Sequence, residues 1–205
     1  MGALIVTEVF GRTPPLPDGL PAIARALASF HVLPVPSQAD RFPLLSHDDP
    51  VAATLQVIEA QAKFLADAGL EPEARLQIKE ELINARKFAA DVSGRQMPIT
   101  LVGSDTHPGN FILQPDGDAI FVDLEKVLYG SPAIDLAHAT IYTSTMWDPD
   151  VAAALDKVDI AAFYDAYFGE LPPALAQRVH PWCTPLQRLT WLRTITWCAK
   201  WRVVS

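Results

Sequence analysis

Two carboxylates and an amide near the middle of the chain have the types and spacing that a phosphoryl transfer needs. Residues 103–110 read Gly-Ser-Asp-Thr-His-Pro-Gly-Asn, and Asp123 follows thirteen residues after Asn110. A carboxylate in a loop, here Asp105, can accept the proton of a substrate hydroxyl. Amide and carboxylate oxygens, here those of Asn110 and Asp123, are ligands that Mg²⁺ takes together with phosphate oxygens. Phosphoryl transfer depends mainly on such positioning and charge neutralisation.

A predicted β-hairpin holds these side chains in place. Apolar runs at 111–113 and 119–122 flank an Asp-Gly turn, which is a strong hairpin signal. Asn110 and Asp123 then lie at the two inner ends of the hairpin, and Asp105 lies in the loop before it. We therefore expect the oxygens of Asn110 and Asp123 to converge on one cation beside Asp105.

Helical periodicity dominates the rest of the chain. Apolar residues recur at helical spacing over 20–31, from Asp49-Pro50 to Gly69, and from Glu71-Pro72 to Gly94. An acidic residue before Pro is typical of a helix start. The second and third segments are predicted to be antiparallel neighbours joined by a very short turn.

Further elements are predicted from shorter signals. Apolar runs at 4–6 and 99–102 fit strands, and additional helices are expected after Pro132, Asp148-Pro149, Pro172-Pro173 and Pro185.

Composition limits the classes of partner. The 205 residues carry a formal net charge of −8, which argues against nucleic acid, because phosphate binding favours a basic surface. An acidic surface could steer a cationic substrate, although acidity that serves only solubility is more common. The first residues resemble neither a signal peptide nor a membrane span, so a cytoplasmic protein without a membrane partner is expected. Cys183 and Cys198 are expected to be free thiols.

Three ordered motifs resemble those of the aminoglycoside phosphotransferase and choline kinase family, which has a protein-kinase-like fold. They are Asp-x-His-Pro-x-Asn at 105–110, Asp-x-Glu at 123–125 and Gly-x-Pro-x-x-Asp-Leu-Ala at 130–137. The resemblance implies that Asp105 is the catalytic aspartate and that Asn110 and Asp123 bind the metal next to ATP. It also implies that Asp135 is a structural residue that braces the catalytic loop.

The resemblance extends to the beginning of the chain. Residues 4–12 resemble the strand that links the two lobes of these kinases. The backbone of that strand contacts adenine, so the resemblance implies ATP contacts at Thr7 and Val9. The implied fold is α+β and mostly helical, with an inter-lobe linker at 1–12 and one helical C-terminal lobe at 13–205 that contains the hairpin. The implied activity is Mg²⁺-dependent transfer of the ATP γ-phosphate to a hydroxyl of a small molecule.

Two departures from the family pattern leave an alternative open. The family usually has His two residues before its catalytic aspartate, where this chain has Gly103. Nothing before residue 4 could form the N-terminal lobe, and none of the lysines matches the phosphate-binding lysine of that lobe. The alternative is a non-catalytic, truncated or degenerate kinase-like lobe that binds a ligand or partner only, and we expect this chain alone to be weak or inactive.

Simpler interpretations exist for the individual residues. Asp105, Asn110 and Asp123 could be a solvated turn, an Asx-type cap and a strand-end carboxylate, although their order favours a catalytic origin. His107 is expected to brace the loop rather than bind phosphate, and Glu125 could either orient the metal shell or be an ordinary exposed carboxylate. Core packing is favoured over a cation-binding aromatic cage for Trp182, Trp191, Trp197 and Trp201. A solvated helix face is favoured over a site for a cationic substrate for Asp148, Asp150, Asp156 and Asp159.

Overall fold

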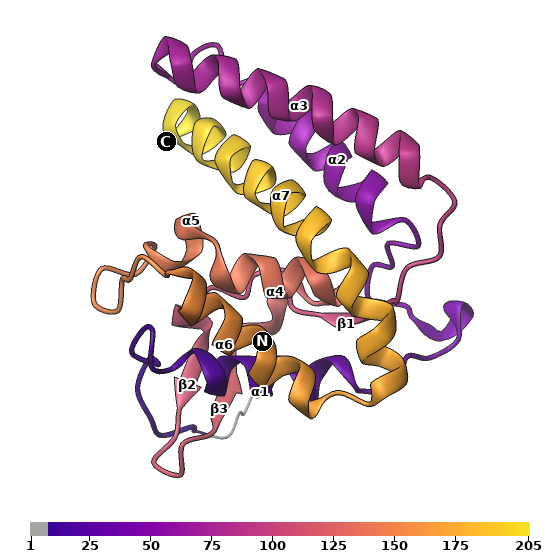
Figure 1. The fold of residues 1–205 in the computed structure, drawn as a ribbon, viewed down its shortest axis with the longest axis vertical. Helices are drawn as coiled ribbons and strands as arrows, with labels where there is room; N and C mark the ends of the chain where they lie inside the picture. Colours follow the sequence, from indigo (N-terminus) through magenta and orange to yellow (C-terminus); the bar gives the residue numbers. More distant parts are fainter. Residues whose placement is uncertain (1–7) are drawn as a thin grey trace, which may run out of the picture.

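The computed structural model describes residues 8–205 and is mostly helical with two small antiparallel sheets, as predicted (Figure 1). The predicted strand at 4–6 lies outside the described residues. The helices are α1 (Leu20–His31), α2 (Pro50–Ala62), α3 (Pro72–Val92), α4 (Pro132–Thr140), α5 (Tyr142–Thr145), α6 (Lys157–Glu170) and α7 (Pro173–Val204), with 3₁₀-helices η1 (Gln38–Asp40), η2 (Pro108–Asn110) and η3 (Leu124–Lys126). The strands are β1 (Thr100–Val102), β2 (Phe111–Leu113), β3 (Ala119–Phe121) and β4 (Leu128–Gly130).

The predicted hairpin is confirmed, and the remaining strands pair with each other. Strands β2 and β3 are antiparallel with Ile112 opposite Ile120, and β1 pairs antiparallel with β4 with Leu101 opposite Tyr129. Strand β4 was not predicted, because it contains Gly130 in place of an apolar run and its identity depends on the distant pairing with β1.

The segment before α1 packs against the hairpin. Arg12 N donates to Leu113 O at 3.1 Å and Leu113 N donates to Arg12 O at 2.7 Å, so Arg12 extends the hairpin by one bridge. A Cβ atom at Gly11 would lie 2.4 Å from the Leu113 carbonyl oxygen. Only glycine therefore allows this close approach of the two backbones.

The predicted helix starts at Asp49-Pro50 and Glu71-Pro72 are confirmed. Asp49 is the N-cap of α2, and its side chain accepts a hydrogen bond from Ala52 N at 2.9 Å. The connection between α2 and α3 spans residues 63–71, so the prediction of a very short turn was wrong. Leu65 in this connection packs against the core, and its place in the apolar pattern made the helix look longer than it is.

Two predicted helix starts are incorrect. Asp148-Pro149 lies in a turn in which the Asp148 carboxylate accepts from Asp150 N, because a short acidic side chain can replace helical hydrogen bonds with local ones. The next helix, α6, begins at Lys157, where Asp156 and Asp159 form a reciprocal capping box. Helix α7 is continuous from Pro173 to Val204 and contains Pro185 in its interior rather than at its start.

Helices α7 and α1 make the largest contacts between elements of the fold. Helix α7 packs against α2 and α4, while α1 packs against α6 and strand β3. Figure 1 shows α2, α3 and the C-terminal part of α7 side by side at one end, with α1, α6 and the β2–β3 hairpin at the other. Cys183 and Cys198 on α7 are free thiols, as predicted. Within residues 8–205, no helix has both the length and the apolar character required to cross a bilayer.

An aromatic ring on β3 occupies the space beside Gly103. A Cβ atom at Gly103 would lie 2.3 Å from Cε1 and Cζ of Phe121. The Phe121 ring stacks on Phe111 at a centroid distance of 4.8 Å and contacts the edge of Phe30 at 5.5 Å. The position where the family usually has His is therefore closed to any side chain by this aromatic cluster.

We expect Gly103→Ala to lower the free energy of unfolding by about 1–3 kcal/mol, because the added methyl group overpacks the cluster around Phe121. Gly169→Ala is the control: Gly169 lies in α6 with no atom within 4 Å of an added Cβ. The control should be neutral or more stable by up to about 1 kcal/mol, since alanine is the better helix former. Urea denaturation measures both.

The aromatic cluster can be tested separately from any general effect on the loop. In a Phe121→Leu background the ring is gone, so Gly103→Ala should cost clearly less than it does in the wild type. Equal costs in both backgrounds would show that Phe121 does not limit position 103.

Candidate active site

A fully buried carboxylate on α4 holds the loop that carries Asp105. Asp135 is 0% exposed, and it accepts hydrogen bonds from Gly103 N at 2.6 Å and Ser104 N at 2.9 Å. The Thr106 hydroxyl donates to the backbone oxygen of Asp135 at 2.7 Å. Residues on both sides of Asp105 are therefore attached to one helical turn, which confirms the bracing role expected of Asp135.

The same carboxylate connects the loop to α1 and α6. His31 Nε2 lies 3.2 Å from Asp135 Oδ2, and His31 Nδ1 lies 2.9 Å from the Tyr167 hydroxyl. A carboxylate oxygen can only accept, so His31 donates from Nε2 to Asp135. Burial raises the pKa of Tyr167 well above its ordinary value, so its hydroxyl keeps its proton and can donate it to Nδ1.

Asp105 forms an ion pair with Lys126, a residue that the sequence did not single out. Lys126 Nζ lies 2.5 Å from Asp105 Oδ2. Burial alone would raise the pKa of Asp105, but the hydrogen bond from Lys126 and the nearby rings of His138 and His107 hold it below the usual value of a carboxyl. Asp105 is therefore a carboxylate at neutral pH, the state that a proton acceptor requires.

Asn110 and Asp123 meet at the same end of the hairpin, as predicted. Val122 N donates to Asn110 O at 2.9 Å, so Asp123 directly follows the residue bonded to Asn110. The buried Asn110 side chain donates from Nδ2 to the backbone oxygen of Asp105 at 2.8 Å. The hydrogen bond to Asp105 and the charge of Asp105 raise the pKa of Lys126, and the charges of Glu125 and Asp123 add to this effect.

Among residues 8–205, two non-glycine residues adopt left-handed backbone conformations, and both lie at this site. They are Ser104, with φ 62°, and Asp123, with φ 58°. Such conformations cost roughly 1–3 kcal/mol each and concentrate at functional sites. The turn at Asp123 leads the chain from β3 into η3 (Leu124–Lys126), and this reversal returns Lys126 to Asp105.

The oxygen donors of Asn110 and Asp123 fit a hard cation such as Mg²⁺. The amide nitrogen of Asn110 is used by the Asp105 carbonyl, which leaves its oxygen available. The Asp123 side chain is exposed and makes no hydrogen bond to another described residue. Residues 8–205 contain no group of three or more His, Cys, Asp or Glu side chains that could hold a metal by themselves. A Mg²⁺ site with two protein ligands and phosphate oxygens needs no such group.

The other predicted site residues have varied positions. Thr7 lies outside the described residues, and Val9 is half-buried in a non-helical segment. His107 Nδ1 accepts from Gly109 N at 3.1 Å, which confirms the expected bracing of the loop. Glu125 is exposed on η3 and contributes to the raised pKa of Lys126.

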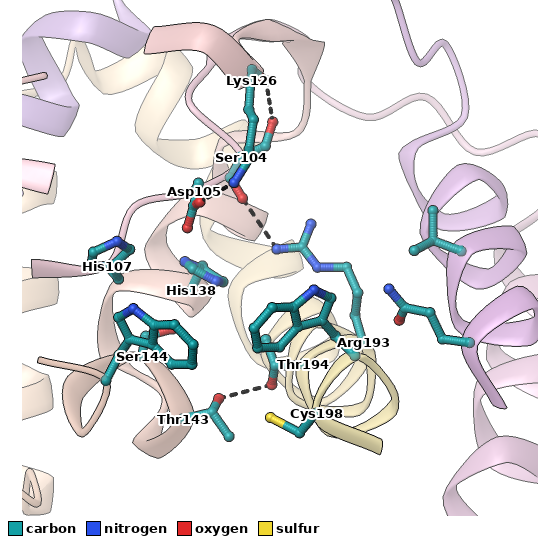
Figure 2. A pocket seen from close by; sticks show the side chains of 14 residues that line it. Ser104, Asp105, His107, Lys126, His138, Thr143, Ser144, Arg193, Thr194 and Cys198 are labelled. Carbon is teal, nitrogen blue, oxygen red and sulfur yellow. Dashed lines mark hydrogen bonds and ion pairs between the residues drawn. The ribbon is translucent and has the colours of Figure 1, made fainter. Parts of the chain in front are cut away.

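Asp105 opens into a cavity of about 510 Å³ (Figure 2). Its walls come from α2, the loop after β1, α4, α5 and α7. The lining residues are Val57, Gln61, Ser104, Asp105, His107, Lys126, His138, Thr143, Ser144, Trp147, Arg193, Thr194, Trp197 and Cys198. Trp182 and Trp191 pack against the core as predicted, but Trp197 and Trp201 are 38% and 53% exposed, so core packing was the wrong prediction for these two.

Two further polar residues of the cavity were missed by sequence reasoning. His138 Nδ1 accepts from Thr106 N at 3.1 Å, and burial together with the charge of Arg193 lowers the pKa of His138 to about 3. Arg193 Nη2 donates to Ser104 O at 3.3 Å. The available signals were weak: His138 lies one helical turn after Asp135, and Arg193 is a cation within an otherwise apolar stretch.

Comparisons with known proteins place the chain in a family. The family model of the phosphotransferase enzyme family matches residues 7–177. A search of curated protein sequences gave no match.

Solved structures of small-molecule kinases have a similar fold. A Plasmodium vivax ethanolamine kinase is 15% identical with a TM-score of 0.59, covering 93% of this chain and 56% of that one. The choline kinase LicA from Streptococcus pneumoniae is 15% identical with a TM-score of 0.56, and the match covers 93% of this chain and 59% of that one. An aminoglycoside-3′-phosphotransferase of type VIII is 18% identical with a TM-score of 0.53, and the match covers 86% of this chain and 60% of that one.

This chain thus spans less than two thirds of the length of these solved structures, and the likeness establishes the protein-kinase-like fold. The family model covers most of the 205 residues, including both the Asp105–Asn110 loop and the Asp123 turn. The chain belongs to the phosphotransferase enzyme family.

Proposed function

We propose that this chain is the C-terminal lobe of a kinase that transfers the γ-phosphate of ATP to a hydroxyl of a small molecule. The observation that carries the proposal is the ionised Asp105 carboxylate at the wall of a cavity, with Asn110 and Asp123 next to its loop. Family membership supports phosphoryl transfer in general. Nucleotide use is supported by similar folds solved with AMP, in LicA, and with AMP-PNP, in an amicoumacin kinase.

In the proposed reaction the substrate hydroxyl oxygen forms a bond to the γ-phosphorus while the bond between that phosphorus and the leaving ADP oxygen breaks. The hydroxyl proton passes to the Asp105 carboxylate, which is within reach of a molecule in the cavity. Lys126 keeps Asp105 ionised before the reaction, and the neutral His138 ring can orient the substrate by donating from Nε2, since its Nδ1 already accepts from Thr106.

Asn110 and Asp123 are proposed to hold Mg²⁺, which supplies charge neutralisation for the ATP phosphates. Thr7 and Val9 are proposed to contact adenine through their backbones, in an inter-lobe linker formed by residues 1–12. Residues 13–205 would then form one lobe. The proposed partner is a small hydroxyl compound rather than nucleic acid or a membrane, and the proposed location is the cytoplasm.

A second candidate is a lobe that binds a ligand without transferring phosphate. It is supported by the Lys126 ion pair, which occupies Asp105. The two candidates differ in whether the chain, given Mg²⁺ and ATP, releases ADP when a hydroxyl compound is present.

Replacing each of the two carboxylates by an amide of the same shape should cause a different defect in the protein. In a full-length version of the protein, Asp105→Asn removes the proton acceptor, so ADP release should fall by about 10²- to 10⁴-fold while Mg-ATP binding is kept. Asp123→Asn removes a metal ligand, so calorimetric titration should show weaker nucleotide binding only when Mg²⁺ is present. Asp91→Asn, an exposed site on α3, is the control.

Retained turnover in both variants would overturn the assignment of Asp105 and Asp123. A wild-type chain that binds Mg-ATP but releases no ADP with any hydroxyl compound would favour the non-catalytic candidate.

Lys126→Met should raise the pKa of Asp105, because it removes a hydrogen bond and a charge that favour the carboxylate. As pH falls, Asp105 would then become protonated at a higher pH than in the wild type. A ¹³C NMR titration of the Asp105 carboxyl measures this without any turnover. Lys200→Met, at an exposed position on α7, should leave the titration unchanged. An unaltered Asp105 titration in Lys126→Met would contradict the proposed role of the ion pair.

A further inference from the structure

The cavity beside Asp105 has a charge opposite to that of the whole chain. The chain carries a formal net charge of −8, but the cavity lining contains one carboxylate, Asp105, and two permanent cations, Lys126 and Arg193. The remaining titratable rings, His107 and His138, are mostly neutral at pH 7, because burial lowers the pKa of each. The one carboxylate is already paired with Lys126, so among the lining residues only the positive charge of Arg193 has no ion-pair partner.

Arg193 differs from the arginines that are held in ion pairs. Arg41, Arg86 and Arg188 each lie within 4.0 Å of a carboxylate oxygen. Arg193 has no such ion pair within residues 8–205, and its hydrogen bond to the Ser104 carbonyl, at 3.3 Å, uses one of five N–H donors.

The carboxylate of Asp135 influences Arg193 most strongly, but its oxygens are already used in other hydrogen bonds. The charge of Asp135 raises the pKa of Arg193 against the lowering effect of burial, but both oxygens of Asp135 already accept hydrogen bonds from Gly103, Ser104 and His31. The hydrogen bonds to Asp135 leave its oxygens no room for a bidentate pair with Arg193, and the remaining donors of Arg193 form a planar fork that matches a carboxylate or a phosphate. This fork lies at the cavity wall (Figure 2).

The rest of the cavity suits a small hydroxylated molecule. Trp147 and Trp197 meet edge to face at a centroid distance of 5.4 Å, and both are partly exposed, which provides an apolar wall. Trp197 lies four residues after Arg193 on α7, so the two share one face of the helix. The hydroxyls of Thr143 and Thr194, which bond to each other at 2.9 Å, add polar groups to the same cavity.

We propose that the hydroxyl substrate of this site is an anion, with a carboxylate or phosphate group bound by Arg193 and a hydroxyl directed at Asp105. The proposal rests on the phosphotransferase function proposed above. Arg193 contacts the carbonyl of Ser104, the residue next to Asp105, so the anionic group and the reacting hydroxyl are only a few bonds apart in the substrate. A cationic amine would face Arg193 and Lys126 with no unpaired carboxylate in the cavity lining.

Matched compounds that differ only in charge test this proposal on the complete chain without nucleotide. The three-carbon set is D-glycerate, glycerol 3-phosphate, glycerol and 3-aminopropane-1,2-diol, and the six-carbon set is D-glucuronate, glucose 6-phosphate, glucose and glucosamine. Isothermal titration calorimetry should show at least one anion binding at least about tenfold more tightly than its neutral and cationic counterparts. The carboxylate and phosphate members show which anionic group is preferred.

Variants of Arg193 connect that preference to one side chain. Arg193→Gln should weaken binding of the preferred anion by about 10- to 100-fold and leave binding of its neutral counterpart unchanged, whereas a purely structural role would weaken both. Arg193→Lys keeps the charge but loses the fork, so an intermediate affinity is expected. Arg188→Gln removes an exposed arginine from the same helix and should have no effect.

The proposal is overturned if no anion of either set binds more tightly than about 1 mM, the upper end of common KM values, or if a neutral or cationic member binds as well as its anionic counterpart. It is also overturned if Arg193→Gln leaves the anion affinity unchanged. ATP-dependent phosphorylation of a neutral or cationic alcohol alone would overturn the anion site and keep the phosphotransferase function. Anion binding that depends on Arg193, in a full-length version that neither binds Mg-ATP nor releases ADP, would instead contradict the phosphotransferase function.

Discussion

The carboxylate of Asp135 is completely buried, and a buried charge is tolerated only when hydrogen bonds surround it. Here the donors are two backbone N–H groups of the loop before Asp105 and the Nε2–H of His31. Satisfying this charge therefore determines where the loop lies. The same requirement brings α1, α4 and α6 together. His31 of α1 donates to Asp135 of α4, and Tyr167 of α6 hydrogen-bonds to the ring of His31. The position of Asp105, the cavity beside it and the reach of Arg193 to Ser104 all follow from this anchor.

Backbone geometry then sets the chemistry of the site. The left-handed residues Ser104 and Asp123 reverse the chain at two places, and the second reversal brings Lys126 back to Asp105. The family usually has His at the position of Gly103. In this chain an aromatic cluster around Phe121 fills the space beside Gly103. The loop is braced instead by Asp135, His31 and the internal hydrogen bond of His107. The loss of that His therefore leaves the loop with other supports.

Net charge and local charge lead to different conclusions about the ligand. The acidic composition suggested a cationic substrate as one possibility, but the acidic residues from Asp148 to Asp159 make local caps and turns, and the cavity itself collects Lys126 and Arg193. Long-range steering and local recognition are separate effects, since a surface field is screened within about 10 Å at moderate salt whereas a buried cation is screened much less. The identity of the ligand is therefore governed by the residues lining the cavity.

The sequence alone determined the elements whose signals are local. Caps and periodic apolar residues located α1, α2 and α3, and an Asp-Gly turn located the β2–β3 hairpin. The order of Asp105, Asn110 and Asp123 predicted a candidate site. Strand β4, the partners of Asp135 and the cavity cations were decided by tertiary structure. His31 lies 104 residues from Asp135 in the sequence, and Arg193 lies 89 residues from Ser104. Contacts at such separations leave no periodic or turn signal, because they depend on how α1 and α7 pack against α4 and not on any property of the neighbouring residues.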